Sequence, residues 1–312
     1  MKLALVFPGQ GSQSVGMLQS FAETKSVRET FAEASDVLGQ DLWKLVCEGP
    51  AEALNSTVNT QPLMLTAGYA VYRAWLAAGG VQPAMVAGHS LGEYTALVAA
   101  GVIAFRDALP LVRFRAQAMQ EAVPLGAGAM AAILGVDDDS VRNACSEAAQ
   151  GEVVEPVNFN APSQVVIAGH KSAVERAAAV AKSKGAKRAL MLPVSAPFHC
   201  SLLKPAALRL EQYLAGIDFN APQIPVINNV DVTIVDEPRL IKDALARQAC
   251  NPVRWVELIR HMARCGVTHV AECGPGKVLA ALTRRIDGTL QGFAISDAAA
   301  LTGALQTLRQ AA

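Results

Sequence analysis

One pentapeptide, Gly88-His89-Ser90-Leu91-Gly92, constrains the fold of this chain more than any other feature. It has the pattern G-x-S-x-G, follows a short apolar run over 84–87 and precedes helix-forming residues over 91–100. A strand that turns sharply into a helix strains the middle residue, and the flanking glycines remove Cβ atoms that would collide there. The serine hydroxyl is then exposed at a helix N-terminus, where developing negative charge is stabilised. This context favours a nucleophilic Ser90 over the alternative, an ordinary glycine–serine loop.

The composition indicates a large buried core and excludes some classes of function. Hydrophobic residues make up 52% of the 312 residues and charged residues only 17%, which argues against disorder. The 27 basic and 27 acidic side chains balance, so the chain has no overall positive field with which to coat nucleic acid. The length suits a large domain that carries a smaller one.

The cysteines and the N-terminal sequence indicate a cytoplasmic protein. Six cysteines are scattered without a C-x-x-C pair, so we expect reduced thiols and no metal site. The apolar run that begins near Met1 ends at Pro8, which is too short for a signal peptide. The longest apolar stretch, 96–105, is too short to span a bilayer, so we expect no membrane partner.

The order of the predicted elements indicates a mostly parallel sheet with helices on both faces. The first part of the chain has predicted strands at 3–7 and 84–87 and predicted helices at 25–38, 62–78, 91–100 and 107–122. In the last of these helices, Asp107 is expected as the N-cap, with Pro110 in the first turn. Strands and helices alternate in the same way after residue 196. The predicted strands are at 224–227 and 267–271, and the predicted helices are at 200–215, 238–248, 253–264 and after 276.

A different pattern occupies the middle of the chain, beginning at Pro124. It predicts strand, helix, strand, strand, helix and strand, over 129–134, 139–149, 153–159, 164–169, 171–183 and 187–192. The order βαββαβ is that of a ferredoxin-like domain. We therefore predict a large domain formed by 1–123 and 197–312, and a small domain inserted over 124–196.

A serine hydroxyl is a poor nucleophile and needs a base within hydrogen-bond reach. Of the five histidines, His199 follows an Ala-Pro-Phe segment at the predicted domain boundary, where clefts form, and this favours it modestly. His261 lies on a half-exposed helix, His269 alternates within a strand as core residues do, and His170 lies in a turn. His89, beside the nucleophile, is expected to turn its side chain away and support the turn.

An oxyanion needs two hydrogen-bond donors close together. The backbone amide of Leu91, which follows the nucleophile, is one natural donor. A second is expected from the glycine-rich loop over 7–13, which leaves the first strand. The alternative for this loop is a dinucleotide fingerprint, but the third glycine of that pattern would have to replace Ser14.

Arg115 occupies an unexpected place on its helix. At about 100° per residue, the apolar face centres on Val112, and Arg115 falls inside that face, whereas Arg113 falls at its polar edge. A guanidinium on a buried face is costly unless it meets an anion. Two anions fit: a carboxylate of the protein in a structural ion pair, or a substrate carboxylate bound in bidentate fashion.

Stretches along nearly the whole chain resemble the malonyl-CoA:acyl-carrier-protein transacylases of bacterial fatty-acid synthesis. They follow the order of that family, and they are 7–13, 88–94, 115–119, 158–160, His199-Cys200, Gln248 with 251–253, and 272–276. No position in them departs from the family pattern. The resemblance implies an α/β-hydrolase-like core with a mostly parallel sheet, an inserted ferredoxin-like domain, and an active site in the cleft between them.

The resemblance also implies roles for individual residues. Ser90 would be the nucleophile and His199 the base, and the backbone carbonyl of Gln248 would orient His199 in place of a triad carboxylate. The backbone amides of Gln10 and Leu91 would hold the oxyanion. The residues expected to bind substrate are Arg115, on the malonyl carboxylate, together with Gln10, Met119, His89, Asn158 and Asn160. The bottom-up argument agrees on Ser90 but does not single out Gln248.

The implied reaction is ping-pong transfer of a malonyl group from malonyl-CoA to the phosphopantetheine thiol of holo acyl carrier protein. No metal or redox cofactor is expected, and we expect a monomer. Carrier proteins of this pathway are acidic, so basic residues are candidates for docking them. These are Lys182, Lys184, Lys187 and Arg188 in the small domain, and Lys277, Arg284 and Arg285 near the C-terminal end.

Three alternatives remain for the function. A hydrolase shares the serine turn, but Arg115 and the missing triad carboxylate argue against it. A stand-alone acyltransferase that serves a polyketide synthase shares every motif named above. A non-catalytic module that docks carrier proteins is disfavoured because Ser90 and His199 are both intact.

Overall fold

Four parallel strands form the larger of two sheets in the computed structural model, which describes residues 1–310. They are ordered β2-β1-β7-β8, with bounds β1 (Leu3–Phe7), β2 (Met85–Gly88), β7 (His269–Cys273) and β8 (Gln291–Ile295). The two central strands, β1 and β7, are buried over their whole length, which is typical of a parallel sheet covered on both faces.

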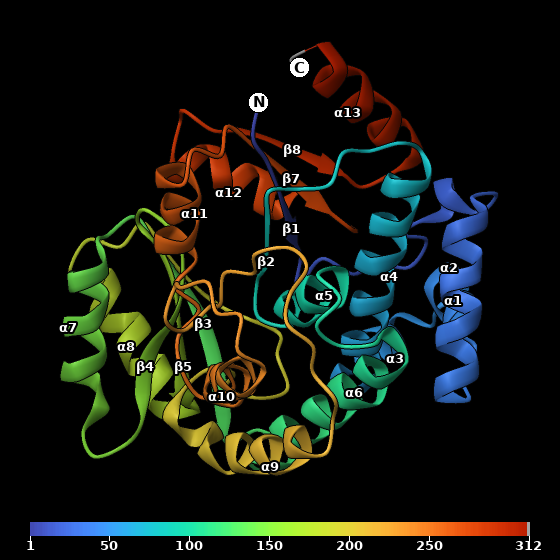
Figure 1. The fold of residues 1–312 in the computed structure, drawn as a ribbon. Helices are drawn as coiled ribbons and strands as arrows, with labels where there is room; N and C mark the ends of the chain where they lie inside the picture. The colour runs from blue at the N-terminus through green and yellow to red at the C-terminus, as the bar shows by residue number, and fades with distance from the viewer. Residues whose placement is uncertain (311–312) are drawn as a thin grey trace.

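Helices provide the crossover connections and cover both faces of this sheet (Figure 1). Alternate side chains of β1 belong to two different apolar clusters: Leu3, Leu5 and Phe7 to one, Ala4 and Val6 to the other. The helices of this part are α1 (Lys25–Leu38), α2 (Leu42–Glu48), α3 (Ala51–Asn55), α4 (Thr57–Ala77), α5 (Gly92–Ala99), α6 (Phe105–Glu121), α9 (Lys204–Ala215), α10 (Pro238–Gln248), α11 (Trp255–Arg264), α12 (Val278–Ile286) and α13 (Ala298–Gln310).

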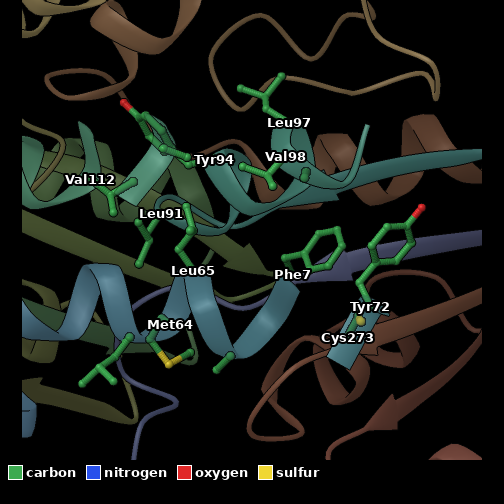
Figure 2. Close-up of a cluster of buried hydrophobic side chains, with 14 of the residues drawn as sticks. Phe7, Met64, Leu65, Tyr72, Leu91, Tyr94, Leu97, Val98, Val112 and Cys273 are labelled. Carbon is green, nitrogen blue, oxygen red and sulfur yellow. The ribbon is translucent and has the colours of Figure 1, made fainter. Parts of the chain in front are cut away.

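The larger apolar cluster fixes the start of α5 relative to β1. Figure 2 shows Phe7 at the end of β1 in one cluster with Met64 and Leu65 of α4 and with Leu91, the residue before α5. All four side chains are at most 1% exposed. Well-packed cores resist displacement, so the turn that holds Ser90 has a rigid base.

The smaller sheet is antiparallel and has the strand order β4-β5-β3-β6. Its strands are β3 (Gly128–Leu134), β4 (Val154–Ala161), β5 (Gln164–His170) and β6 (Arg188–Met191), and its helices are α7 (Asp138–Ala149) and α8 (Lys171–Ser183). The first and third strands of this segment lie at the centre, which is the ferredoxin-like arrangement. The predicted fold class, a parallel α/β core with a separate ferredoxin-like sheet, is confirmed.

Two backbone hydrogen bonds join the small sheet to the larger part of the molecule. The backbone amide of Phe159 donates to Val253 O at 3.0 Å, and the amide of Val253 donates to Val157 O at 2.8 Å. They hold β4 beside the segment that precedes α11, so that Asn158 is fixed between the two parts. The domain boundaries at 123/124 and 196/197 stay predictions.

Several elements differ from the sequence-based predictions. Helix α6 begins at Phe105 with Ala104 as its N-cap, so Asp107 lies in the first turn and the N-cap prediction is wrong. The predicted strand at 224–227 pairs with β2 only through a single bridge at Val226. Strand β8 and helices α2, α3 and α13 were not predicted, because each is short or follows a segment without clear periodicity. None of the helices over residues 1–310 combines the length and apolar character needed to cross a bilayer.

A buried carboxyl group stands at the N-terminus of α12. Glu272 of β7 is fully buried, and its Oε2 accepts the backbone amide of Ala280 at 2.9 Å. Its Oε1 has no hydrogen-bond partner among the described residues. Burial raises the pKa of Glu272 to about 7, although the amides at the start of α12 favour the charged form.

Glu272→Gln is expected to change how stability depends on pH. A carboxyl whose pKa rises on folding stabilises the folded state at low pH, and this contribution is lost as pH rises from about 4.5 to about 7. Between about pH 5 and about pH 7.5 the variant should therefore lose less unfolding free energy than the wild type, by on the order of 2 kcal/mol. Urea unfolding at both pH values measures this difference, and equal losses in the two proteins would contradict it.

Candidate active site

Ser90 lies in the turn between β2 and α5, with a positive φ of 53°. A Cβ atom on Gly88 would overlap the backbone of Gly92, and a Cβ atom on Gly92 would overlap the backbone of Phe7. The two glycines therefore allow α5 to start directly against the carboxyl ends of the strands. This geometry is a nucleophile elbow, with the serine at the N-terminus of a helix.

His199 is the histidine that contacts Ser90. Its Nε2 lies 2.7 Å from Ser90 Oγ, and its Nδ1 lies 2.8 Å from the backbone oxygen of Gln248. A carbonyl oxygen can only accept, so Nδ1 carries the proton and Nε2 is free to accept from the serine. Burial lowers the pKa of His199 to about 3, helped by the positive charge of Arg115. The ring is therefore neutral, as a general base must be at neutral pH.

The other histidines make different contacts. His170 Nδ1 accepts the backbone amide of Val153 at 2.9 Å, and His269 Nδ1 lies 2.8 Å from Thr268 Oγ1. His261 is half-buried in the last turn of α11. His170 ends strand β5, His269 begins strand β7, and His261 lies on α11, and none of the three contacts the serine.

Two backbone amides are available near Ser90. The N–H groups of Leu91 and Gln10 donate to no protein acceptor in the part of the chain that the structure describes, and both residues line the same cavity. The loop after β1 approaches the elbow closely, since a Cβ atom on Gly9 would lie 2.5 Å from His89 O. Two free amides beside a nucleophile can bind an oxyanion. This geometry supports the assignment of Leu91 and Gln10 as the oxyanion donors, which stays a prediction.

Arg115 extends from α6 toward Ser90 and is 2% exposed. Its Nη1 donates to Gln61 Oε1 at 2.8 Å, and its Nη2 donates to Gln248 Oε1 at 2.9 Å and lies 3.3 Å from Ser90 Oγ. Among the described residues no carboxylate oxygen lies within the 4.0 Å of an ion pair with this guanidinium. The positive charge therefore stands beside the serine without a directly paired anion.

A cavity of about 550 Å³ opens onto these groups. Its lining includes Gln10, His89, Ser90, Leu91, Arg115, Asn158 and His199, together with apolar side chains from both parts of the molecule, among them Met130, Leu192 and Phe198. The buried Oδ1 atom of Asn158 has no hydrogen-bond partner among the described residues. It is thus an acceptor available to a donor group on a ligand in this cavity.

Two of the predicted substrate contacts are placed outside the cavity lining. Met119 is fully buried in the apolar core under α6, and the cavity lining does not include it. Asn160 is also outside the lining, and its Oδ1 lies 2.8 Å from Nε2 of His89. His89 does line the cavity, and the contact with Asn160 fixes the orientation of its ring. Asn160 thus acts on the cavity through His89.

The sequence analysis missed two residues that hold the site together. Asn229 Oδ1 accepts the backbone amide of Ser90 at 2.8 Å, and its Nδ2 donates to Gly88 O at 2.7 Å. Gln61, 1% exposed on α4, supports Arg115 as described above. A signal for Asn229 existed, because it lies two residues after the apolar run predicted as strand 224–227, and polar residues at strand ends often serve sites in α/β folds.

Comparison with known proteins identifies the family. A model of the acyl transferase domain matches residues 4–306. The chain belongs to the acyl transferase family. This acyltransferase is 60% identical over 306 residues to the Malonyl CoA-acyl carrier protein transacylase of Escherichia coli, a match that covers 98% of this chain and 99% of the relative.

Solved structures resemble this acyltransferase over nearly its full length. The acyl-carrier-protein S-malonyltransferase of Burkholderia pseudomallei is 69% identical, with a TM-score of 0.97 over 98% of this chain and 100% of that one. A malonyl-transacylase solved in complex with its type II PKS acyl-carrier protein is 55% identical, with a TM-score of 0.97 and the same coverage, 98% and 100%.

Proposed function

We propose that this acyltransferase transfers a malonyl group from malonyl-CoA to the phosphopantetheine thiol of an acyl carrier protein, through a malonyl ester of Ser90. One observation carries the choice of acyl group. The guanidinium of Arg115 lies buried 3.3 Å from Ser90 Oγ without a paired carboxylate. A malonyl thioester brings a free carboxylate to that place, and an acetyl thioester does not. The names of the relatives support the same substrate and partner.

In the first half-reaction Ser90 attacks the thioester of malonyl-CoA. The Oγ proton passes to Nε2 of His199 as Oγ bonds to the carbonyl carbon, and the amides of Gln10 and Leu91 receive the oxyanion. The C–S bond then breaks, and the CoA thiolate takes the proton from His199. The carbonyl of Gln248 holds Nδ1–H throughout, which keeps the imidazole in the required tautomer.

The second half-reaction reverses these steps with a different thiol. The phosphopantetheine thiol gives its proton to His199, and its sulfur attacks the ester carbonyl of malonyl-Ser90. The C–O bond breaks, and Oγ recovers the proton from the imidazolium. Carbon and sulfur keep their oxidation states in both steps, so the proposed reaction requires no redox cofactor.

Intact-mass measurement tests this function directly. Malonyl-CoA alone should add one malonyl group to the protein, and a holo acyl carrier protein added afterwards should remove it and gain the same mass. Release of free malonate to water at a rate equal to transfer would favour the hydrolase alternative. Because a relative acts with a type II PKS carrier protein, carriers from fatty-acid and polyketide synthesis should both be offered, and kcat/KM compared.

We propose that the carrier protein docks on the basic edge of the small sheet. Arg188 begins β6, the edge strand, and Lys187 directly precedes it. Leu192, which follows β6, lines the cavity. No carboxylate of the described residues lies within ion-pair distance of Lys187 or Arg188. Lys184, in contrast, pairs with Glu147 at 2.6 Å, so its charge is partly neutralised.

Reversing both charges at this edge, with Lys187→Glu and Arg188→Glu, is expected to raise the KM for the carrier protein about tenfold at low salt. The rate of malonyl loading from malonyl-CoA should stay unchanged, because the chemical groups are untouched. Added salt should reduce the difference between variant and wild type. Lys25→Glu, an exposed charge reversal on α1, serves as the control. Transfer that is insensitive to salt would contradict this docking surface.

A further inference from the structure

A buried carboxyl group lies behind Ser90, and the transfer steps make no use of it. Glu93, in the first turn of α5, is 2% exposed. Its Oε2 accepts the backbone amide of Asn229 at 3.0 Å and the side-chain Nε2 of Gln248 at 2.8 Å. No Lys, Arg or His within the described residues forms an ion pair with it. Burying a carboxylate without an ion-pair partner costs free energy, so its hydrogen bonds must offset that cost.

The bond from Gln248 Nε2 to Glu93 is one of the contacts that set the orientation of the Gln248 amide. This amide stands between Glu93, which in the ionised form only accepts, and Arg115, which only donates. Its Nε2 donates to Glu93 Oε2 and, at 2.9 Å, to the backbone oxygen of Ser90, while its Oε1 accepts Arg115 Nη2 at 2.9 Å. With Glu93 in place, only one of the two amide orientations satisfies all three neighbours.

The bond from the Asn229 backbone to Glu93 holds Asn229 under the elbow. The Asn229 backbone donates to Glu93, while its side chain accepts the amide of Ser90 and donates to Gly88 O. Ser90 has a positive φ, a conformation that costs energy and persists only where neighbours over-determine it. The N–H of Ser90 bonds to Asn229, and the C=O of Ser90 bonds to Gln248. Asn229 and Gln248 both donate to Glu93, so the two polar groups of the Ser90 backbone are linked to the same carboxyl group.

We propose that Glu93 is a positioning residue of the acyl-transfer site. Through the Gln248 amide it holds the guanidinium of Arg115 in the place where it meets the acyl carboxylate, and through Asn229 it holds Ser90. The inference rests on the proposed function, because it concerns the choice between acyl groups with and without a carboxylate. Ser90, His199 and the oxyanion amides act on both kinds of acyl group alike. The ratio of kcat/KM for malonyl-CoA to that for acetyl-CoA therefore isolates the contribution through Arg115.

A double-mutant cycle tests the inference. Glu93→Ala and Gln248→Ala should each lower the malonyl-to-acetyl ratio, by roughly ten- to hundredfold, since each removes support from a charged group. Gln248→Ala keeps the backbone carbonyl that orients His199. If Glu93 acts on Arg115 through the Gln248 amide, the double variant should lower the ratio no further than Gln248→Ala alone. Glu93→Gln keeps one oxygen able to accept both N–H groups, so it should retain the ratio within about threefold.

The controls separate positioning from general stability. Glu272→Ala removes another buried carboxyl, which hydrogen-bonds to the start of α12 and not to Gln248 or Asn229, and it should lower the melting temperature while leaving the ratio unchanged. Independent, multiplicative losses in the cycle would overturn the inference, and so would equal losses for both acyl groups in Glu93→Ala. Failure of the proposed function is distinguishable, because a wild-type protein without malonyl preference would show it before any variant is made.

Discussion

The Ser90→Ala protein is expected to form no covalent adduct with malonyl-CoA and to lose acyl transfer by on the order of 10⁶-fold. The substitution removes one hydroxyl and leaves the contacts of the Ser90 backbone with Asn229 and Gln248 in place, so the fold should be retained. His199→Ala should be nearly as damaging, beyond the roughly 10²–10⁴-fold typical of removing a general base. The 2.7 Å contact makes the two residues one functional unit, so the double variant should lose little more than either single one.

Intact-mass analysis after incubation with malonyl-CoA measures the adduct, and the rate of carrier malonylation measures transfer. His170→Ala is the matched control, because His170 binds the backbone of Val153 and does not contact the serine. A malonyl group found on another residue of the Ser90→Ala protein would refute the nucleophile. A larger loss in His170→Ala than in His199→Ala would refute the base.

Much of the fold could be predicted because its elements repeat a simple periodicity. Helices α1 and α8 have the ends that the sequence analysis predicts, and the six elements of the small sheet come in the predicted order. Strand β8 was missed because its five residues, Gln-Gly-Phe-Ala-Ile, mix polar, small and apolar side chains without the continuous apolar run of β1, and they become a strand only by pairing with β7. Tertiary pairing, which no local window contains, decides such cases.

The candidate site divides in a similar way. Ser90 could be predicted because the elbow is local, and strand, glycines and helix are adjacent in the sequence. His199 stands 109 residues away, so only its place at a predicted boundary pointed to it. The role of Gln248 rests on a backbone carbonyl, which every residue has, and only the resemblance to a family indicated it. Asn229 and Glu93 form hydrogen bonds between distant segments. Asn229 belongs to no motif, and Glu93 lies within the stretch 88–94, whose pattern indicates no role for it.

The Arg115→Ala protein is expected to lose malonyl transfer by about 10²–10³-fold, while acetyl transfer holds or rises. A carboxylate brought into this buried cavity without its guanidinium partner would be left unpaired, which typically costs about 3–5 kcal/mol. Acetyl-CoA has no such carboxylate, and for it the substitution removes only a nearby positive charge. Values of kcat/KM for both thioesters, measured with the same protein preparation, give the ratio that decides the matter.

A structural role for Arg115 leads to a different pattern. An ion pair that stabilised the fold would make Arg115→Ala lower the melting temperature and impair both acyl groups equally. The hydrogen-bond partners of Arg115 are Ser90 Oγ and the neutral amides of Gln61 and Gln248, and Glu93 bonds to the second of these amides. Arg115→Lys should recover little malonyl transfer, because an ammonium cannot contact both amides and a carboxylate in the planar geometry of a guanidinium. If the malonyl-to-acetyl ratio of kcat/KM is unchanged in Arg115→Ala, specificity resides elsewhere in the cavity. If the ratio falls while acetyl transfer stays normal, specificity for the malonyl group is assigned to Arg115.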